Sequence, residues 1–251
     1  MQINISEIKD YMRCPLYYKF KHVDGLAYTK TLDDLYSEYL KTSIYYFYFS
    51  AIESKVRSIE SLLKKWENLW FSSEMRKTFY EEDLRHASTK ASMVFTNFYK
   101  DIDSEKFSPI AVNFASESMF PGEENAQVIM NTDLIKVAND RTRNSSTEIV
   151  FFNTKKTRED DFMLRNDLKL TLASHSFRSS FKTKEDRIVV HNITTRKKTP
   201  TVRTGSDFSR AEKIVRNICT GISNNVFYPA PNKLYCTNCR YKLYCMNERS
   251  L

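Results

Sequence analysis

Three of the five cysteines in this chain of 251 residues lie close together near the C-terminal end, in the sequence YCTNCRYKLYC. Cys236, Cys239 and Cys245 have the spacing C-x2-C-x5-C, which is typical of thiolate ligands for zinc or for an iron–sulfur cluster. Either group needs a fourth ligand. Cys14, in YMRCPLYYKF, has proline and aromatic neighbours like those of the C-terminal cysteines. Cys219 lies in an amphipathic segment, where a cysteine usually packs as a small hydrophobic residue, so Cys14 is preferred.

The composition favours a metal site over disulfide bonds. A chain of this length buries a sizeable core without covalent cross-links. The odd number of cysteines, the absence of a signal peptide and the absence of a long apolar run predict a soluble protein of a reducing compartment with no membrane partner. The expected location is the cytoplasm of a bacterial or phage-infected cell, since a composition rich in Lys, Asn and Tyr with only four glycines suggests an AT-rich genome.

Basic residues are concentrated in one part of the chain. The net charge is +8, and residues 182–216 contain ten basic and four acidic residues. Such a patch favours a polyanionic partner, although a solvated surface without a partner is an equal alternative. The best candidates for nucleic-acid contact lie in the predicted hairpin TTRKKTPTVRT, and they are Arg196, Lys197, Lys198 and Arg203.

The pattern of apolar residues predicts the elements that position these side chains. Residues 31–105 show mainly helical periodicity. Short apolar or β-branched runs then predict strands of one sheet: SPIAVNFASESMF, AQVIMNTDLIKV, TEIVFFNTKKT and DRIVVHNITTRKK. One helix is expected over 161–181, and a second over 206–219 with Ser206 or Asp207 as its N-cap. The sequence therefore predicts an α/β fold.

The residues that flank the cysteines resemble those of a known family. A CP-x-x-Y-x-F box near one end and F-Y-P-x-P followed by C-x-x-C-x-Y-x-x-x-C near the other are similar to the iron–sulfur nucleases of the PD-(D/E)XK superfamily. These include the AddB helicase–nuclease subunit and RecB-like exonucleases associated with CRISPR adaptation. The resemblance implies a 4Fe–4S cluster held by Cys14, Cys236, Cys239 and Cys245, which would tie the two ends of the chain together. Structural zinc is the alternative, because thiolates suit both.

The resemblance also implies a fold class and an organisation along the chain. We expect a restriction-endonuclease-like mixed sheet flanked by helices, with a helical insertion and a C-terminal Cys-rich iron–sulfur lobe. The expected segments of this one integrated domain are 1–30 with the first cluster ligand, 31–105 helical, 106–220 as the PD-(D/E)XK-like core, and 221–251 as the cluster lobe.

The catalytic motif of the superfamily is incomplete in this chain. The resemblance places the motif aspartate at Asp133 and the motif lysine at Lys155, but Asn153 stands at the acidic position between them. Because side chains alternate along a strand, Glu148 points to the opposite face and is a poor substitute. One carboxylate seldom holds Mg²⁺. The sequence therefore predicts lost or severely weakened nuclease activity, with Mg²⁺ or Mn²⁺ required only if activity is retained.

Other positions also depart from the family pattern. Lys169 and Ala173 stand where Gln-x-x-x-Tyr is usual, Asn113 takes a common acidic position, and YLKTSIYYFYFSAI has tyrosines where many relatives have a histidine. Lys169 could contact phosphate or occupy the charge vacancy left by the metal, and an exposed helix lysine is the alternative reading. Carboxylates that could instead reach a metal from the neighbouring helix are Asp160, Asp161 and Asp167.

Three functions are compatible with these residues. The first is a DNA-binding protein related to RecB-like exonucleases that no longer cuts and acts as an accessory or scaffold factor in replication, recombination or transcription. The second is an active metal-dependent DNA exonuclease with a rearranged acidic site. The third is a protein-interaction module without nucleic-acid binding. Single-stranded DNA or a duplex end is the expected partner in the first two, and a protein partner in a larger assembly is compatible with the first.

Overall fold

The computed structural model describes residues 1–53, 58–103, 107–120, 126–139, 145–155 and 160–248. The chain divides into two compact units, and each consists of separate segments. One unit comprises Met1–Thr29, Ser116–Met130 and Thr204–Leu251, and the other comprises Lys30–Ala115 and Asn131–Arg203. The terminal unit, as we call the first, therefore contains both ends of the chain. The segments expected from the sequence follow chain order, whereas each of these units is discontinuous.

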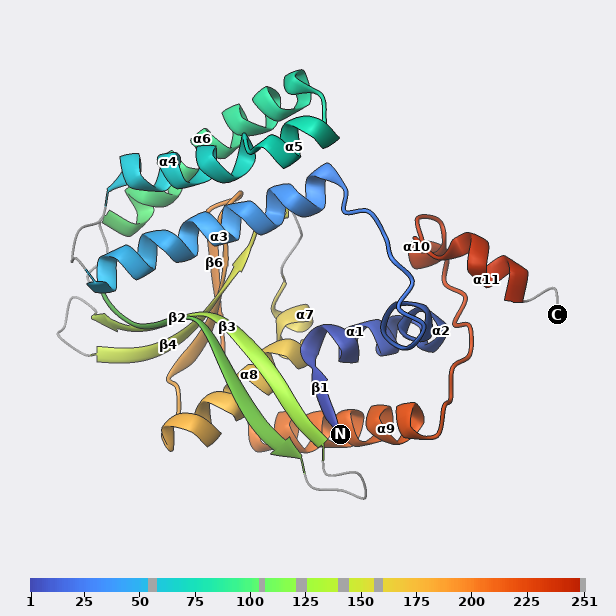
Figure 1. Ribbon diagram of the computed structural model, residues 1–251. Helices are drawn as coiled ribbons and strands as arrows, with labels where there is room; N and C mark the ends of the chain where they lie inside the picture. The colour runs from blue at the N-terminus through green and yellow to red at the C-terminus, as the bar shows by residue number, and fades with distance from the viewer. Residues whose placement is uncertain (54–57, 104–106, 121–125, 140–144, 156–159, 249–251) are drawn as a thin grey trace. The chain divides into compact units, whose positions relative to one another are not determined.

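Six strands form one mixed sheet by their hydrogen-bonded pairing (Figure 1). The strand order is β1-β3-β4-β5-β6, and β2 pairs with β3. The β1–β3 and β4–β5 pairs are parallel, whereas β3–β4 and β5–β6 are antiparallel. Helices flank this sheet, which confirms the predicted mixed α/β architecture. The strands are β1 (Gln2–Asn4), β2 (Phe107–Phe120), β3 (Ala126–Asn139), β4 (Ser145–Asn153), β5 (Arg187–Asn192) and β6 (Lys197–Thr201).

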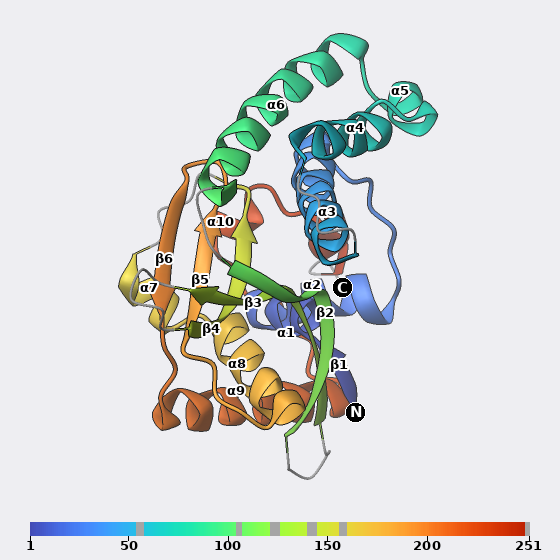
Figure 2. The same cartoon turned by 90° about the vertical axis from the view of Figure 1, so that its left-hand side faces the viewer.

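Four helices form most of the first half of the second unit (Figure 2). They are α3 (Leu32–Glu53), α4 (Ile59–Trp70), α5 (Ser73–Thr78) and α6 (Glu81–Asp103). Ser58 and Ser72 cap α4 and α5 with side-chain oxygens that accept backbone N–H bonds, as helix starts require. Trp66 and Trp70 stack with ring centroids 4.7 Å apart and are fully buried among the helices. The predicted helical region is confirmed for the residues that are described.

The connection between β4 and β5 differs from the single helix expected over 161–181. It contains α7 (Asp161–Arg165) and α8 (Leu168–Phe181). The Asp167 carboxylate accepts a hydrogen bond from the Lys169 backbone N–H at 2.7 Å and so caps α8 as a new helix. A capping side chain therefore divides the segment, although its apolar period is continuous.

The helices of the terminal unit are α1 (Ile5–Arg13), α2 (Pro15–Tyr18), the π-helical turn η1 (Lys19–Val23), α9 (Gly205–Ser223), α10 (Lys233–Cys236) and α11 (Lys242–Glu248). Asn4 and Glu7 form a reciprocal capping box at the start of α1. The expected N-cap of α9 at Ser206 or Asp207 is wrong. Thr204 is the N-cap, and its backbone N–H donates a hydrogen bond to the Asp207 carboxylate at 2.9 Å.

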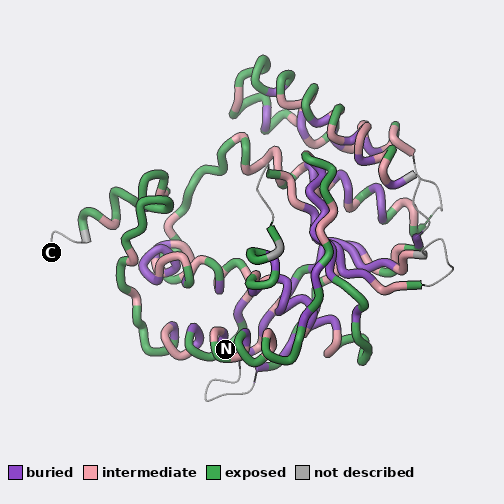
Figure 3. Tube along the Cα trace, turned by 180° about the vertical axis from the view of Figure 1, so that it is seen from behind, coloured by how far each residue is buried: buried purple, intermediate pink, exposed green. Residues whose placement is uncertain are grey.

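Burial differs between the strands and the C-terminal stretch of the chain. Figure 3 shows buried residues along the strands, and largely exposed residues along the C-terminal stretch that contains α10 and α11. In the described part of the chain, no helix has both the length and the apolar character that a membrane crossing needs.

Candidate functional site

Asp133 lies on β3 and is 4% exposed. Its Oδ2 accepts hydrogen bonds from the backbone N–H of Phe152 at 2.7 Å and from the Lys41 ammonium at 3.0 Å. Its Oδ1 accepts one from the Tyr45 hydroxyl at 2.5 Å. Both oxygens of the motif aspartate are therefore bonded to groups of the protein, and two of the donors come from α3.

The electrostatic environment of Asp133 keeps its carboxylate charged. Burial by itself would raise the pKa of Asp133, but the charges of Lys41 and Lys169 and the hydrogen bonds from Tyr45 and Lys41 together lower this pKa below its usual value. Burial and the neighbouring carboxylate raise the pKa of Tyr45, which therefore stays a neutral donor. The charge on Asp133 is thus compensated by lysine side chains of the same unit.

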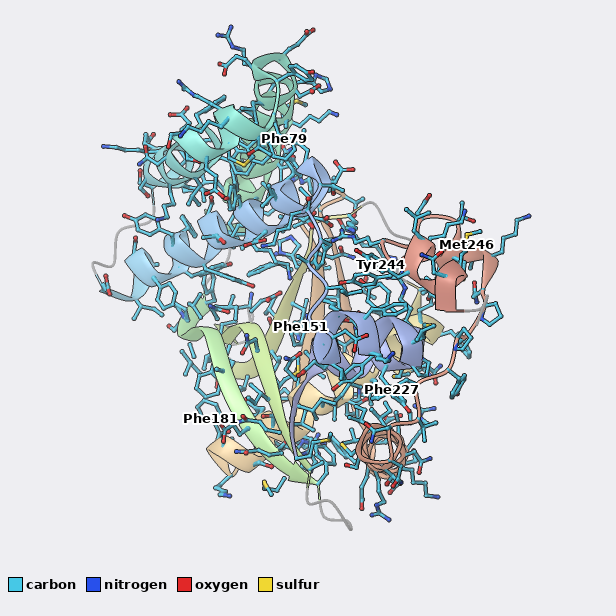
Figure 4. All side chains as sticks on the ribbon, turned by 45° about the vertical axis from the view of Figure 1, so that its right-hand side comes forward. Phe79, Phe151, Phe181, Phe227, Tyr244 and Met246 are labelled. Atoms are coloured by element: carbon cyan, nitrogen blue, oxygen red, sulfur yellow. The ribbon has the colours of Figure 1, made fainter. Side chains whose placement is uncertain are left out.

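The second half of the motif lies at the end of β4. The Asn153 side-chain oxygen accepts a hydrogen bond from the Lys155 backbone N–H at 3.0 Å, and Asn192 donates to the Lys155 carbonyl at 2.8 Å. The Lys155 side chain is exposed. The Lys169 ammonium lies 4.1 Å from the ring centroid of Phe151, which is labelled in Figure 4. This cation–π contact fixes Lys169 beside the strand that carries the motif.

The alternative carboxylates have structural partners where their side chains are described. Glu148 is 4% exposed and forms ion pairs with Lys136 and Arg187, in agreement with its assignment to the other face of β4. Asp160 accepts a hydrogen bond from the backbone N–H of Met163 and caps α7, just as Asp167 caps α8. The side chain of Asp161 lies outside the described residues.

Sequence reasoning missed the role of Lys41 and Tyr45. It noted that tyrosines replace the family's histidine in this helix, but it assigned the charge vacancy to Lys169 alone. Lys41 and Tyr45 are four residues apart, and residues i and i+4 share one helix face, so this spacing could have indicated that the two side chains point the same way. What the sequence could not show is that this face meets Asp133.

The four candidate ligands of the cluster lie together in the terminal unit. Cys14, Cys236, Cys239 and Cys245 all line one cavity of about 190 Å³, far more than the roughly 10–15 Å³ that one water needs. Beside the cavity, Tyr241 is fully buried in a hydrophobic group with Leu16, Tyr17 and Phe20. Three of the four cysteines, Cys14, Cys239 and Cys245, pack against this hydrophobic group. Figure 4 shows Tyr244 and Met246 on α11, the helix that carries Cys245.

Backbone groups orient two of these sulfur atoms. The Ala230 N–H donates to Cys14 Sγ at 3.4 Å, and the Asn232 N–H donates to Cys236 Sγ at 3.3 Å. The Leu16 N–H donates to the Tyr228 carbonyl at 3.1 Å, so the two ends of the chain are directly hydrogen-bonded beside the cavity. Cys219 is 1% exposed in α9, where it packs as a core residue.

No group of three or more His, Cys, Asp or Glu side chains within the described ranges is arranged so that it could hold a metal ion as it stands. The four cysteines share one cavity, but the structure does not present them as a closed coordination shell. The donor types nevertheless fit a thiolate-bound group, because N–H groups directed at sulfur are a common outer shell of such sites.

The predicted basic hairpin forms, but its four candidate residues differ in accessibility. Arg196 is exposed and its Nε lies 3.1 Å from an Asp101 carboxylate oxygen. Lys197 is exposed, whereas Lys198 is half-buried and burial lowers its pKa. Arg203 departs from the expectation of a surface contact, because it is 4% exposed and its guanidinium donates to Thr201, Val202 and Leu164.

The mixed sheet with flanking helices is consistent with a nuclease-like α/β protein. The model of the PD-(D/E)XK nuclease superfamily matches residues 2–246, and the chain belongs to this superfamily. No curated protein matches the chain. Among solved structures, it is similar to the one described as "Crystal structure of SSO0001", with 11% identity, a TM-score of 0.39, and coverage of 90% of this chain and 92% of that chain.

Proposed function

We propose that this protein is an iron–sulfur DNA-binding protein that derives from a nuclease and has lost most or all of its cleavage activity. In this proposal it acts as an accessory or scaffold factor in DNA replication, recombination or transcription. The observation that carries the proposal is the state of the motif aspartate, whose oxygens accept hydrogen bonds from Lys41, Tyr45 and the backbone of Phe152.

Metal-assisted cleavage of a phosphodiester requires several anionic oxygens around the ion, because Mg²⁺ gives up its water reluctantly. Here Asp133 already has a lysine as its counter-ion, and Asn153 contributes a neutral oxygen that accepts a backbone N–H. A metal ion would have to displace the Lys41 ammonium and would then find only one carboxylate in the motif. These features support binding without efficient hydrolysis.

The cysteine cavity supports a thiolate-held cluster at the other site. Cys14, Cys236, Cys239 and Cys245 would be its ligands, and the Ala230 and Asn232 N–H groups would stabilise negative charge on sulfur. A 4Fe–4S cluster would supply a structural link between the two ends of the chain. Zinc in the same residues is the alternative.

The cluster is tested by anaerobic purification followed by visible absorption and by iron and sulfide analysis. Cys14→Ala is compared with Cys219→Ala, which removes a cysteine that lies outside the cavity. We expect wild type and Cys219→Ala to contain a stoichiometric cluster and Cys14→Ala to lose it. Colourless zinc protein, or a cluster indifferent to Cys14, would refute this part of the proposal.

Activity and DNA binding are tested separately from the cluster. Digestion assays with Mg²⁺ or Mn²⁺ on single-stranded and duplex DNA should show little or no turnover, and robust cleavage that Asp133→Ala abolishes would instead establish an active exonuclease. DNA binding should weaken steeply with salt, because neutralised phosphates release counterions. Absence of any DNA binding would favour a protein-interaction module.

A further inference from the structure

The charge around Asp133 is opposite in sign to that of a metal site. A site for a divalent cation gathers carboxylates, whereas here the Lys41 ammonium pairs with a single carboxylate at 3.0 Å. The Lys169 ammonium lies over Phe151, the residue before Phe152, whose N–H binds the same carboxylate. The described side chains here therefore favour an anion over a cation.

The geometry holds Lys41 in place while leaving donors available. Its side chain is 26% exposed, and one of its three N–H groups is directed at Asp133 Oδ2. The carboxylate is itself held by Tyr45 and by the Phe152 N–H, so it positions the ammonium. Asp133 thus acts here as a positioning residue for a lysine.

Lys169 is positioned by a different interaction. Its ammonium lies over the face of Phe151 at 4.1 Å from the ring centroid, and its charge acts on Asp133. The ammonium groups of Lys41 on α3 and Lys169 on α8 are therefore both held beside the Phe151–Phe152 segment of β4, where Asp133 is bound. Phosphate oxygens are well suited to such a pair, because a charged donor and a charged acceptor form strong hydrogen bonds.

We propose that Lys41 and Lys169 form an anion site that takes a backbone phosphate of a nucleic acid directly, without a divalent metal ion. This inference rests on the proposed function, since it specifies how the same site binds DNA. It predicts that DNA binding requires no divalent metal ion and depends on both lysines.

The test is fluorescence anisotropy of a labelled single-stranded oligonucleotide and a labelled duplex, in EDTA and in Mg²⁺. At matched ionic strength we expect wild type to bind in EDTA at least as tightly as in Mg²⁺, because Mg²⁺ is not required and competes for the phosphates. Lys169→Met should weaken binding by about tenfold, the scale of one charge-assisted contact. It should also reduce the salt slope for the duplex by about 0.9. Lys64→Met, which removes an exposed lysine from α4 of the same unit, is the matched control and should bind like wild type.

Lys41 needs a variant that keeps the protein folded, because removing it alone leaves a buried carboxylate unpaired. The pair Lys41→Met/Asp133→Asn removes both charges together, so the net charge of the site is unchanged. We expect it to fold and to weaken DNA binding by about tenfold, as Lys169→Met does.

The outcomes separate this inference from the proposed function. If wild type binds DNA but Lys169→Met and the double variant bind equally well, the anion site is wrong while the proposed function stands. Binding that requires Mg²⁺ and disappears in EDTA would also overturn the site. If wild type binds no DNA at any salt concentration, the proposed function itself fails.

Discussion

Gly221 of α9 is required by the close approach of Tyr11 from α1. A Cβ atom at Gly221 would overlap the Tyr11 hydroxyl and would lie 3.1 Å from its ring carbon Cζ. The hydroxyl cannot move away freely, because it donates a hydrogen bond to the Val226 carbonyl at 2.8 Å. Overpacking of this kind costs about 1–3 kcal/mol, and the better helix propensity of alanine returns about 1 kcal/mol. We therefore expect Gly221→Ala to lower the free energy of unfolding by up to about 2 kcal/mol.

The assay is urea or thermal unfolding of the purified protein, in which 1 kcal/mol corresponds to about 2–4 °C at this chain length. Gly205→Ala is the matched control, since Gly205 begins the same helix and nothing lies within 4 Å of its added Cβ. It should be neutral or slightly stabilising. In a Tyr11→Phe background, the cost of Gly221→Ala should fall by about 1 kcal/mol, because the overlapping oxygen is gone. A stabilising Gly221→Ala in wild type would refute the reasoning.

Two further predictions concern the second unit. His191 is 2% exposed, and burial lowers its pKa to about 4, so the unfolded chain binds a proton more readily than the folded protein at acidic pH. The free energy of unfolding should therefore fall as pH drops below about 6.5, by roughly 2 kcal/mol at pH 5. Urea titrations of wild type and His191→Leu at several pH values measure this change. An equal dependence of the free energy of unfolding on pH in the two proteins would contradict the prediction. Arg203→Met should lower stability by about 2–3 kcal/mol, because the Leu164 carbonyl and its other acceptors lose their donor, yet leave the salt slope of DNA binding unchanged. Lys197→Met should leave stability unchanged and reduce the salt slope of DNA binding, since that side chain is exposed. Unfolding curves and anisotropy distinguish the two variants. A large loss of DNA binding in Arg203→Met with normal stability would show that the buried position of Arg203 is not its main role.

The protein surrounds the two candidate sites with different kinds of polar group. At Asp133 the protein supplies lysine charges that compensate the carboxylate. At the cysteine cavity it supplies N–H donors to sulfur, which suits a ligand set that must carry negative charge. The first arrangement supports the proposed loss of cleavage, and the second supports the proposed structural cluster.

Local patterns were sufficient for much of the fold. Helical periodicity over 31–105, the apolar strand runs and the amphipathic segment of α9 are set by neighbours in sequence, and each forms as expected where it is described. Capping side chains were harder to assign. Thr204 and Asp167 decide where α9 and α8 begin, and several polar residues near each start could have served equally well.

The sequence by itself determined the superfamily, the cysteine spacing and the replacement of an acidic residue by Asn153, because these are properties of residue identity and order. Only the tertiary structure decided which side chains contact Asp133. Lys41 is separated from it by a long stretch of chain, and its ammonium reaches the carboxylate because α3 lies in the same unit as the part of β3 that carries Asp133. Burial then distinguished Arg203 from Lys197 in a single basic segment, since exposure depends on what the rest of the chain covers and not on the residue type.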